Sequence, residues 1–413
     1  MRRVLILVEN LPSPFDRRVW QEACTLRDAG YGVSIICPTG VGCERRFETI
    51  EGVHIYRYRL PLEAAGAAGY ALEYASALVQ TILLSWRVLL TRGFDAVHAC
   101  NPPDLLFLVG GFFKLFGKKF LFDHHDLCPE LYEAKFGRRD LWYRLLLRLE
   151  RLTFGAADVS IATNDSYRRI AVTRGRMPPE RVFVVRSGPS LLRLKRQPPD
   201  ERLKRGRAHL VGYVGVIGEQ EGIDLLLHAV RHIVFELGRR DIQFTLVGGG
   251  TSLERMRSLA AELAVDSFVT FTGRVPDQTL LAVLNTAVVC VNPDRATEMN
   301  DKSTMNKVLE YMALGKPIVQ FDLTEGRWAA QQASLYARGN DSADFAAKIV
   351  ELIDDPRRAA AMGALGRRRV ETELEWSHQA PQLLAAYDAL WSCGAADPAA
   401  ADAARVREGQ STR

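Results

Sequence analysis

The chain has 413 residues, a formal net charge of +5, 47% hydrophobic and 25% charged residues. This length exceeds what one hydrophobic core supports, so two domains are expected, and the composition is that of a globular protein rather than a disordered one. The modest positive charge favours phosphates or a membrane surface as partners, but it lacks the dense basic stripe of a nucleic-acid-binding protein.

The seven cysteines are scattered, with no C-x-x-C pair and no Cys/His ligand spacing. A metal site and a disulfide framework are therefore disfavoured, and a reducing cytoplasm is favoured. The first ten residues, MRRVLILVEN, contain too short an apolar run for a signal peptide and predict a first strand. Without a signal peptide we expect the protein to stay inside the cell. No run approaches the length of a membrane span.

The first half opens with a strand, a helix and a strand, at residues 4–8, 18–30 and 33–37. This spacing is typical of a βαβ unit and predicts a parallel sheet. The loop after the first strand lies where doubly wound sheets bind ligands. The candidates there for a phosphate or acceptor are Asp16, Arg17 and Arg18, with the equal alternative that Asp16 caps the helix and the arginines are solvated.

Apolar strands and helices alternate through the rest of this half. The helix at 141–154 sets basic residues against a Leu, Trp and Phe face, which favours packing on a sheet over lying in a membrane interface. The predicted strands are 53–58, 96–99, 120–122, 159–162 and 183–185, and the predicted helices are 71–90, 105–116 and 141–154.

The strand at 120–122 runs into the sequence DHHDLCPELY. Histidine titrates near neutral pH, and a neighbouring carboxylate orients its ring, so this strand end suits acid and base chemistry. His125 with Asp126 is the preferred catalytic pair.

A basic, proline-containing stretch at 193–207 predicts an exposed linker, after which strands and helices alternate again. Glycine-rich turns at Gly215 with Gly218 and at Gly248 to Gly250 either bring backbone close to a ligand or are plain tight turns. Neither matches G-x-G-x-x-G, so NAD is disfavoured. The predicted strands are 210–216, 243–247, 269–272 and 288–291, and the helices are 223–237, 253–263 and 277–284.

The stretch 301–322, DKSTMNKVLEYMALGKPIVQFD, predicts a helix capped by Ser303 and Thr304 that leads into a buried strand at 318–321. Free N–H groups, the helix dipole, Lys302 and Lys307 favour a diphosphate at its start. Lys307 and Glu310 share a face, where the ammonium suits phosphate and the carboxylate suits ribose hydroxyls. A solvated i,i+3 ion pair is the alternative.

Helices at 342–353 and 357–371 cover the second sheet, and a final helix runs from 376 to about 391. The tail from Gly394 is rich in alanine and polar residues and predicts disorder.

These motifs, in this order, resemble the retaining GT-B glycosyltransferases, specifically the large family four of that class. The resemblance covers the chain up to about Trp391 and rests on V-G-G-G, F-x-G at Phe271 to Gly273, and K-x-x-E-Y-M-A-x-G-K-P-I-V from Lys307. DRRVWQEA, NPPD, HHDLCPELY and NDKSTMNK are similar to a bacterial subgroup associated with exopolysaccharide and lipopolysaccharide assembly.

The resemblance implies an α/β protein of GT-B fold, with two doubly wound parallel-sheet domains facing each other across a cleft and a C-terminal helix returning to the first domain. The expected segments are an acceptor-side domain at 1–192, a basic linker at 193–207, a nucleotide-sugar domain at 208–376, the returning helix at 377–392 and a disordered tail at 393–413.

Carried over to matching positions, the resemblance implies that Glu310 accepts from the donor ribose and that His125 lines the donor sugar. It also places the Gly248 to Gly250 turn and Arg274 near the nucleotide, and the amides from Ser303 to Met305 on the diphosphate. The full set of donor-binding candidates is Asp301, Lys302, Ser303, Thr304, Met305, Lys307, Glu310, Gly218, Gly248, Gly249, Gly250 and Arg274.

Two departures from the family pattern concern charge. The first Glu of the family's pair falls on Lys302, and the usual Arg and Lys that clamp the diphosphate are absent from the frame Gly215 to Gly222. Other cations must stand in, because each lost charge-assisted bond is worth roughly 1.5 to 3 kcal/mol. The available replacements are Lys302, Lys307, Arg274, Arg186 and, across the cleft, Arg17 or Arg18.

The implied activity is transfer of a sugar from a UDP- or GDP-linked donor to a hydroxyl acceptor, with retention and with neither metal nor cofactor. The implied acceptor is a polysaccharide or a polyprenyl- or lipid-linked glycan, reached from the cytoplasm by peripheral contact with the inner face of the cell membrane. Three alternatives stay open: a nucleotide-sugar epimerase of the same fold, a non-catalytic nucleotide-binding or partner subunit, and a membrane-peripheral scaffold.

Overall fold

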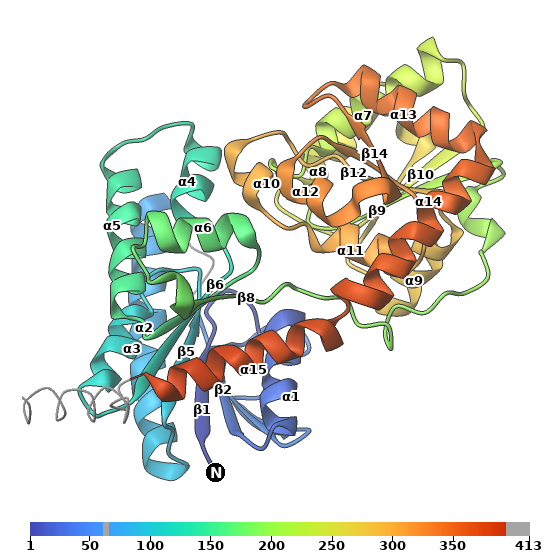
Figure 1. Cartoon of the computed structure of the whole chain (residues 1–413). Helices are drawn as coiled ribbons and strands as arrows, with labels where there is room; N and C mark the ends of the chain where they lie inside the picture. The colour runs from blue at the N-terminus through green and yellow to red at the C-terminus, as the bar shows by residue number, and fades with distance from the viewer. Residues whose placement is uncertain (61–65, 394–413) are drawn as a thin grey trace, which may run out of the picture.

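The computed structural model describes residues 1–60 and 66–393, which fold into two α/β domains joined by a linker and by a C-terminal helix (Figure 1). The predicted disordered tail lies outside the described residues, apart from Cys393.

The first domain is built on an eight-stranded sheet in the order β3-β4-β2-β1-β5-β6-β7-β8. All neighbours are parallel except the edge pair β3 and β4, which is antiparallel. Consecutive strands β1 and β2 pair in parallel because α1 makes the crossover between them. The strands are β1 (Arg3–Leu7), β2 (Gly32–Pro38), β3 (Phe47–Ile50), β4 (Val53–Tyr58), β5 (Ala96–Cys100), β6 (Lys119–His124), β7 (Val159–Ala162) and β8 (Val182–Val184).

Helices cover both faces of this sheet, and each face has its own apolar core. One core contains side chains of α2, α3, α5 and α6, and the other contains those of α1 and α15. The first-domain helices are α1 (Arg17–Asp28), α2 (Gly66–Thr91), α3 (Phe107–Lys114), α4 (Cys128–Phe136), α5 (Leu141–Ala156) and α6 (Asp165–Thr173).

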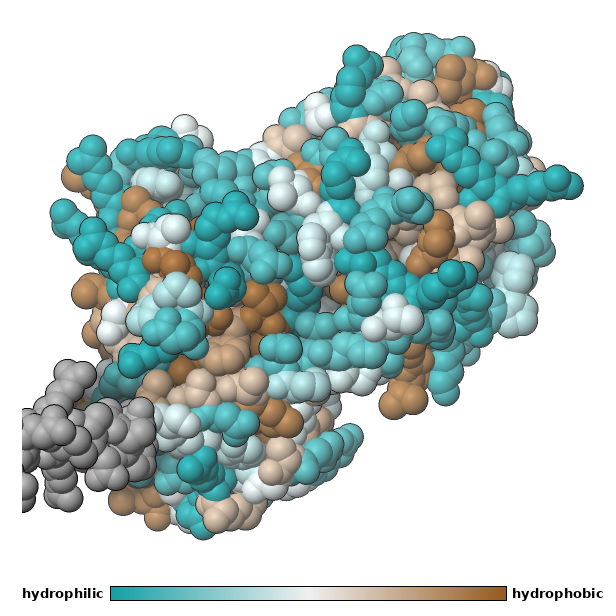
Figure 2. Space-filling model, in the orientation of Figure 1, coloured by the Kyte–Doolittle hydropathy of each residue, from teal (hydrophilic) through white to brown (hydrophobic). Residues whose placement is uncertain are grey.

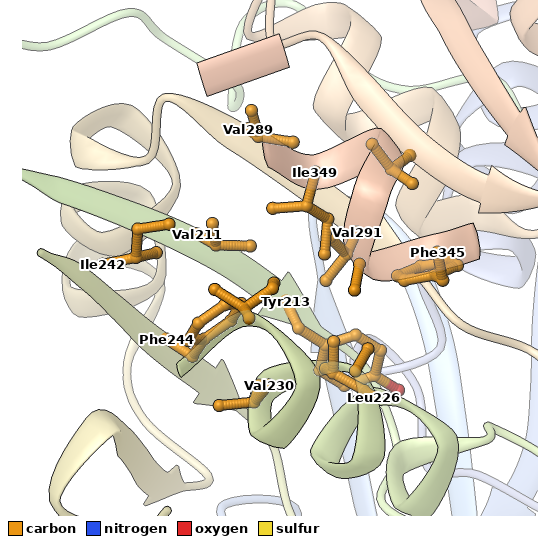
Figure 3. Close-up of a cluster of buried hydrophobic side chains, with 14 of the residues drawn as sticks. Val211, Tyr213, Leu226, Val230, Ile242, Phe244, Val289, Val291, Phe345 and Ile349 are labelled. Atoms are coloured by element: carbon orange, nitrogen blue, oxygen red, sulfur yellow. The ribbon is translucent and has the colours of Figure 1, made fainter. Parts of the chain in front are cut away.

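The second domain has a six-stranded, wholly parallel sheet in the order β11-β10-β9-β12-β13-β14. In Figure 3, Val211 and Tyr213 of β9 and Phe244 of β10 face Leu226 of α7 and Phe345 of α13. The strands are β9 (His209–Val214), β10 (Ile242–Val247), β11 (Val269–Gly273), β12 (Val289–Asn292), β13 (Ile318–Phe321) and β14 (Ser334–Ala337). The helices are α7 (Ile223–Arg231), α8 (Leu253–Glu262), α9 (Asp277–Thr286), α10 (Glu298–Lys302), α11 (Asn306–Ala313), α12 (Thr324–Ala330), α13 (Ser342–Asp354) and α14 (Pro356–Arg369).

The last helix, α15 (Trp376–Ser392), leaves the second domain and packs on the first, as predicted (Figure 1). Its Leu383, Ala386, Tyr387 and Leu390 are fully buried in the first-domain core. The Trp376 indole Nε1 donates to Thr25 Oγ1 at 2.9 Å. The second domain is therefore connected to the first at two points along the chain.

The expectation that no run reaches membrane-span length needs correction for α2. Residues Glu73–Thr91 are long and apolar enough to cross a membrane by length and composition, with a mean hydropathy of 1.2. Helix α2 packs Ala77 and Val88 into the first-domain core, and 22% of this window is buried.

Candidate functional site

Helix α11 stands beside the carboxyl end of β9, and its first turn carries Lys307. The Lys307 ammonium lies 2.8 Å and 3.0 Å from the two carboxylate oxygens of Asp294, which is buried, and 5.0 Å from the ring centre of Tyr213. A Cβ on Gly215 would come 3.2 Å from Lys307 Cε. Lys307 therefore faces the glycine turn that follows β9.

One turn further, Glu310 contacts two arginines from outside its own helix. Arg17 Nη1 of the first domain donates to Glu310 Oε1 at 3.0 Å, and Arg193 of the linker donates to the same oxygen. The same two arginines also bind Asp277, at 2.7 Å and 3.1 Å. Glu310 thus lies at the contact between the second domain, the linker and the first domain, and its partners are arginines rather than Lys307.

Arg193, Asp277 and Asp294 were missed by the sequence analysis. Arg193 falls in the stretch predicted as an exposed linker, yet its side chain is mostly buried and its neighbour Leu194 is fully buried. The only available signal was the excess of arginine in that stretch, which does not distinguish a linker residue in the cleft from one in solvent.

The glycine turns serve close packing of backbone on backbone. A Cβ on Gly248 would lie 1.8 Å from the carbonyl oxygen of Gly215, and one on Gly250 would lie 2.4 Å from that of Ile217. Ile217 N donates to Gly249 O at 3.0 Å, which ties the two turns together. The close packing of the two turns explains why glycine is required at Gly248 and Gly250. The turn that contains Gly215 lies next to Lys307.

The helix predicted to start at Ser303 and Thr304 begins instead at Asn306, after a break that separates α10 from α11. Met305 occupies the N-cap position without a side-chain cap. Ser303 Oγ donates to Met299 O and lies 3.2 Å from the Tyr167 hydroxyl, while Thr304 Oγ1 accepts from Asn164. Both hydroxyls are used locally or across the domain interface, so the capping prediction was wrong.

Two further donor-binding candidates, Asp301 and Lys302, pair with other groups of the protein. Asp301 caps α12, accepting from Thr324 N at 2.8 Å and from Thr324 Oγ1 at 3.0 Å. Lys302 binds Glu298 at 2.6 Å and lies 3.6 Å from Glu130 of the first domain. These residues join the domains or stabilise helix ends.

The first domain contributes His125 at the end of β6, and its acidic partner differs from the prediction. His125 Nε2 lies 2.6 Å from Asp123 Oδ2, whereas the hydrogen bonds of Asp126 to Asn101 use the Asp126 backbone. Asp123 and His125 are two residues apart, and side chains at that spacing leave an extended segment on the same side. The pairing of His125 with Asp126 was therefore wrong.

The three candidates at the start of α1 have separate roles. Asp16 accepts from Val19 N at 3.2 Å as the N-cap, which confirms the alternative given for it. Arg18 is buried and binds Asp123 at 2.9 Å, while Arg17 turns the other way to the second domain. Arg17 is thus the cation of this pair that reaches across the cleft.

Of the other proposed replacement cations, Arg274 of the second domain contacts the first domain, and Arg186 of the first domain is buried in contacts that include the second. The Arg274 guanidinium lies 5.6 Å from the ring centre of Phe15, in the loop before α1. Arg186 is buried against Asp165, Glu325 and the ring of Trp328. The turn after Gly218 adds an acid, Glu221, whose pKa is raised by burial, while nearby Lys307 lowers it.

Two family models match the chain. A "Glycosyl transferase 4-like domain" matches residues 16–188, and "Glycosyl transferases group 1" matches residues 208–355.

Curated relatives align over parts of their length. The chain is 32% identical over 162 residues to a GDP-mannose-dependent monoacylated alpha-(1-6)-phosphatidylinositol monomannoside mannosyltransferase of Corynebacterium glutamicum, covering 38% of the chain and 41% of that protein. It is 30% identical over 279 residues to a D-inositol 3-phosphate glycosyltransferase of Thermomonospora curvata, covering 62% and 61%. The chain spans about half the length of the curated relatives it matches.

Solved structures share the whole architecture at low sequence identity. Sucrose-phosphate synthase from Thermosynechococcus elongatus superposes with a TM-score of 0.76 at 19% identity, covering 95% of this chain and all of that one. The Anabaena protein HepE, in complex with UDP and glucose, gives 0.71 at 13% identity, covering 94% and 100%. These likenesses show a GT-B fold, and the predicted fold class is confirmed.

Proposed function

The chain belongs to the glycosyltransferases of GT-B fold, and we propose that it transfers a sugar from a nucleotide diphosphate to a hydroxyl group with retention of anomeric configuration. Relatives that act on GDP-mannose and a structural neighbour that binds UDP support a UDP- or GDP-linked donor.

The observation that carries the proposal is the geometry of α11. Lys307 faces the Gly215 turn, and Glu310 lies between Arg17 of the first domain and Arg193 of the linker with its side chain 16% exposed. A diphosphate against Lys307 and the free amides of this helix start would leave its ribose one turn along, where Glu310 can accept from hydroxyls.

The diphosphate is neutralised, in this proposal, by cations outside the usual clamp. Arg17 and Arg193 both bind Glu310 and Asp277, so each lies within a side-chain movement of the space beside Lys307. A nucleotide whose ribose replaces these arginines on Glu310 frees their guanidinium groups, which bind phosphate well as bidentate donors.

The chemistry follows from this placement. The bond between the anomeric carbon and the phosphate oxygen breaks, the acceptor oxygen bonds to that carbon on the same face, and its proton passes to the departing phosphate oxygen. Lys307, Arg17 and Arg193 stabilise the negative charge on the leaving diphosphate without a metal ion. His125 orients the sugar from the first domain.

The acceptor is, in this proposal, attached to a lipid, and the first domain carries the surface that approaches the membrane. Figure 2 shows apolar side chains among polar ones on the side where Figure 1 places α2, α3 and α5. Leu90 is 80% exposed, Leu115 is 82% exposed and Trp142 is 60% exposed. Helix α5 also carries Arg144, Arg148 and Arg151, and such a basic, aromatic surface suits anionic lipid headgroups.

The test has two stages. A panel of UDP- and GDP-sugars is screened for thermal stabilisation, and the best donor is then incubated with bacterial lipid extract, with and without EDTA, to look for a glycosylated lipid. Transfer that survives EDTA supports the proposal. A sugar epimer formed from the donor alone would favour the epimerase, and binding without turnover would favour the non-catalytic subunit.

A further inference from the structure

Behind His125, a group of buried polar side chains connects the first-domain sheet to helix α15. It consists of Arg18 and Glu22 of α1, His98 of β5, Asp123 of β6 and Tyr387 of α15. Arg18 is 7% exposed and the other four are fully buried. Such a group is costly to bury unless its members satisfy one another, so its arrangement is specific.

The charges in this group are balanced by Arg18. Its Nη2 lies 2.9 Å from Asp123 and 3.1 Å from Glu22. Burial alone would raise the pKa of Asp123, but Arg18 and His125 hold that pKa well below its usual range. Burial and the charge of Asp123 raise the pKa of Glu22 well above its usual range.

The same residues have metal-ligand chemistry, because donor atoms of Glu22, His98, Cys100 and Asp123 lie within 4.8 Å of one another. The guanidinium of Arg18, however, already contacts both carboxylates of this set. A fixed positive charge in that position opposes a second cation, so the group is better explained as a buried cluster of ion pairs around Arg18.

A chain of close polar contacts runs from α15 to His125, and its middle contact, at His98 Nε2, is longer than an ordinary hydrogen bond. The Tyr387 hydroxyl lies 2.9 Å from His98 Nδ1. His98 Nε2 lies 3.5 Å from Asp123 Oδ2, and the same oxygen lies 2.6 Å from His125 Nε2.

Proton positions follow from the ionised Asp123 at the centre. An oxygen that is negatively charged accepts, so His98 Nε2 carries the proton toward it. His125 Nε2 lies 2.6 Å from Asp123 Oδ2 and also accepts from Arg18 Nε at 3.0 Å, so Asp123 and Arg18 together hold the His125 ring. His98 is neutral because burial lowers its pKa, so its Nδ1 has a lone pair and accepts from the Tyr387 hydroxyl. The hydroxyl thus selects the His98 tautomer that faces Asp123.

We propose that Tyr387 of the returning helix is a positioning residue for the transfer reaction, acting through His98 and Asp123 to fix the orientation of His125. This inference rests on the proposed function, in which His125 orients the donor sugar. In this proposal α15, which continues from the second domain, determines the orientation of His125 in the first domain.

The test compares two tyrosine variants on the same helix interface. Tyr387→Phe removes the hydroxyl that reaches His98, whereas Tyr31→Phe removes a hydroxyl that accepts from Trp391 Nε1 at 3.0 Å and has no role in the path. Both variants lose one hydrogen bond at α15. Steady-state kinetics with the donor and acceptor identified above gives kcat and KM for each, and thermal unfolding gives their stability.

We expect Tyr387→Phe to lower kcat about threefold to tenfold with little change in the donor KM, and Tyr31→Phe to keep the wild-type kcat. Equal kcat values for the two variants would overturn the inference. The variant His125→Ala tests the role of His125 separately from that of Tyr387. Full activity of His125→Ala refutes the assigned role of His125. Loss of activity in His125→Ala, together with wild-type activity in Tyr387→Phe, refutes only the influence of α15 on His125.

If Tyr387→Phe does not fold, variants of His98 decide. His98→Gln retains an amide that can reach Asp123 and an oxygen that can accept from Tyr387, whereas His98→Leu retains neither. A kcat that is higher for glutamine than for leucine supports the path. Equal kcat values for these two variants would overturn it.

Discussion

Replacing Lys307 by methionine is expected to reduce both stability and donor binding. The ammonium is the partner of Asp294, whose side chain is 2% exposed, at 2.8 Å. Removing one member of a buried ion pair costs about 3 to 5 kcal/mol, because the other charge stays buried and unpaired. For domains of this size each kcal/mol lowers Tm by roughly 2 to 4 °C, so we expect a drop on the order of 10 °C.

A second substitution separates the two losses. Lys307→Met with Asp294→Asn removes both charges, and replacement of a whole buried pair is often close to neutral, so most of the stability should return. Donor affinity should not return, because a charge-assisted bond to phosphate is worth about 1.5 to 3 kcal/mol, or roughly 10- to 150-fold in Kd.

Thermal unfolding and isothermal titration with UDP and GDP measure these effects. Asp294→Asn alone is the matched control, and we expect it to bind nucleotide at least as tightly as the wild type because Lys307 loses its competing carboxylate. Wild-type affinity in the double variant would refute the assignment of Lys307 to the diphosphate.

Three further outcomes are expected. Glu310→Gln should weaken nucleotide binding by about tenfold in titration while leaving Tm within a few degrees, and an unchanged Kd would contradict its role at the ribose. Gly248→Ala should destabilise the protein by several kcal/mol in urea unfolding, because its Cβ would lie 1.8 Å from a carbonyl oxygen, whereas Gly249→Ala, 3.5 Å from its nearest neighbour, should be nearly neutral. Burial, with a smaller effect of Glu73, raises the pKa of Glu9 from 4.5 to about 8. The stability that Glu9 contributes below its unfolded pKa is therefore lost as the pH rises toward 8, so Glu9→Gln should be more stable than the wild type by a few kcal/mol at pH 8.5 and similar to it at pH 4.5. A gain of equal size at both pH values would show that the carboxyl proton is not responsible.

Most sheet strands could be predicted from the sequence, because parallel strands buried on both faces appear as short apolar runs. The edge strands β3 and β14 were not predicted, since half-exposed residues such as those of Phe47–Ile50 give no such run. Helix α4 was also missed because its nine residues mix apolar and charged types with almost no periodic pattern.

The site was predicted only where local spacing determines it. Lys307 and Glu310 share a helix, so their common face follows from three-residue spacing, and in the structure each pairs with a charge from another segment. Asp294, Asp277 and Arg193 reach this place from other segments, and no local pattern indicates which charges meet across a fold. The break between α10 and α11 arises from tertiary contacts of Ser303 and Thr304, which outweigh their capping preference.

The position of α15 determines how this protein can be divided. The first domain is discontinuous in sequence, because its second apolar core is completed by Leu383, Ala386, Tyr387 and Leu390 from the far end of the chain. A fragment that stops near residue 192 would expose this core to water and aggregate. The same fragment co-expressed with residues 376–393 could bind α15, which would cover the core. During synthesis the core of the first domain cannot be completed until the ribosome has made the second domain and α15.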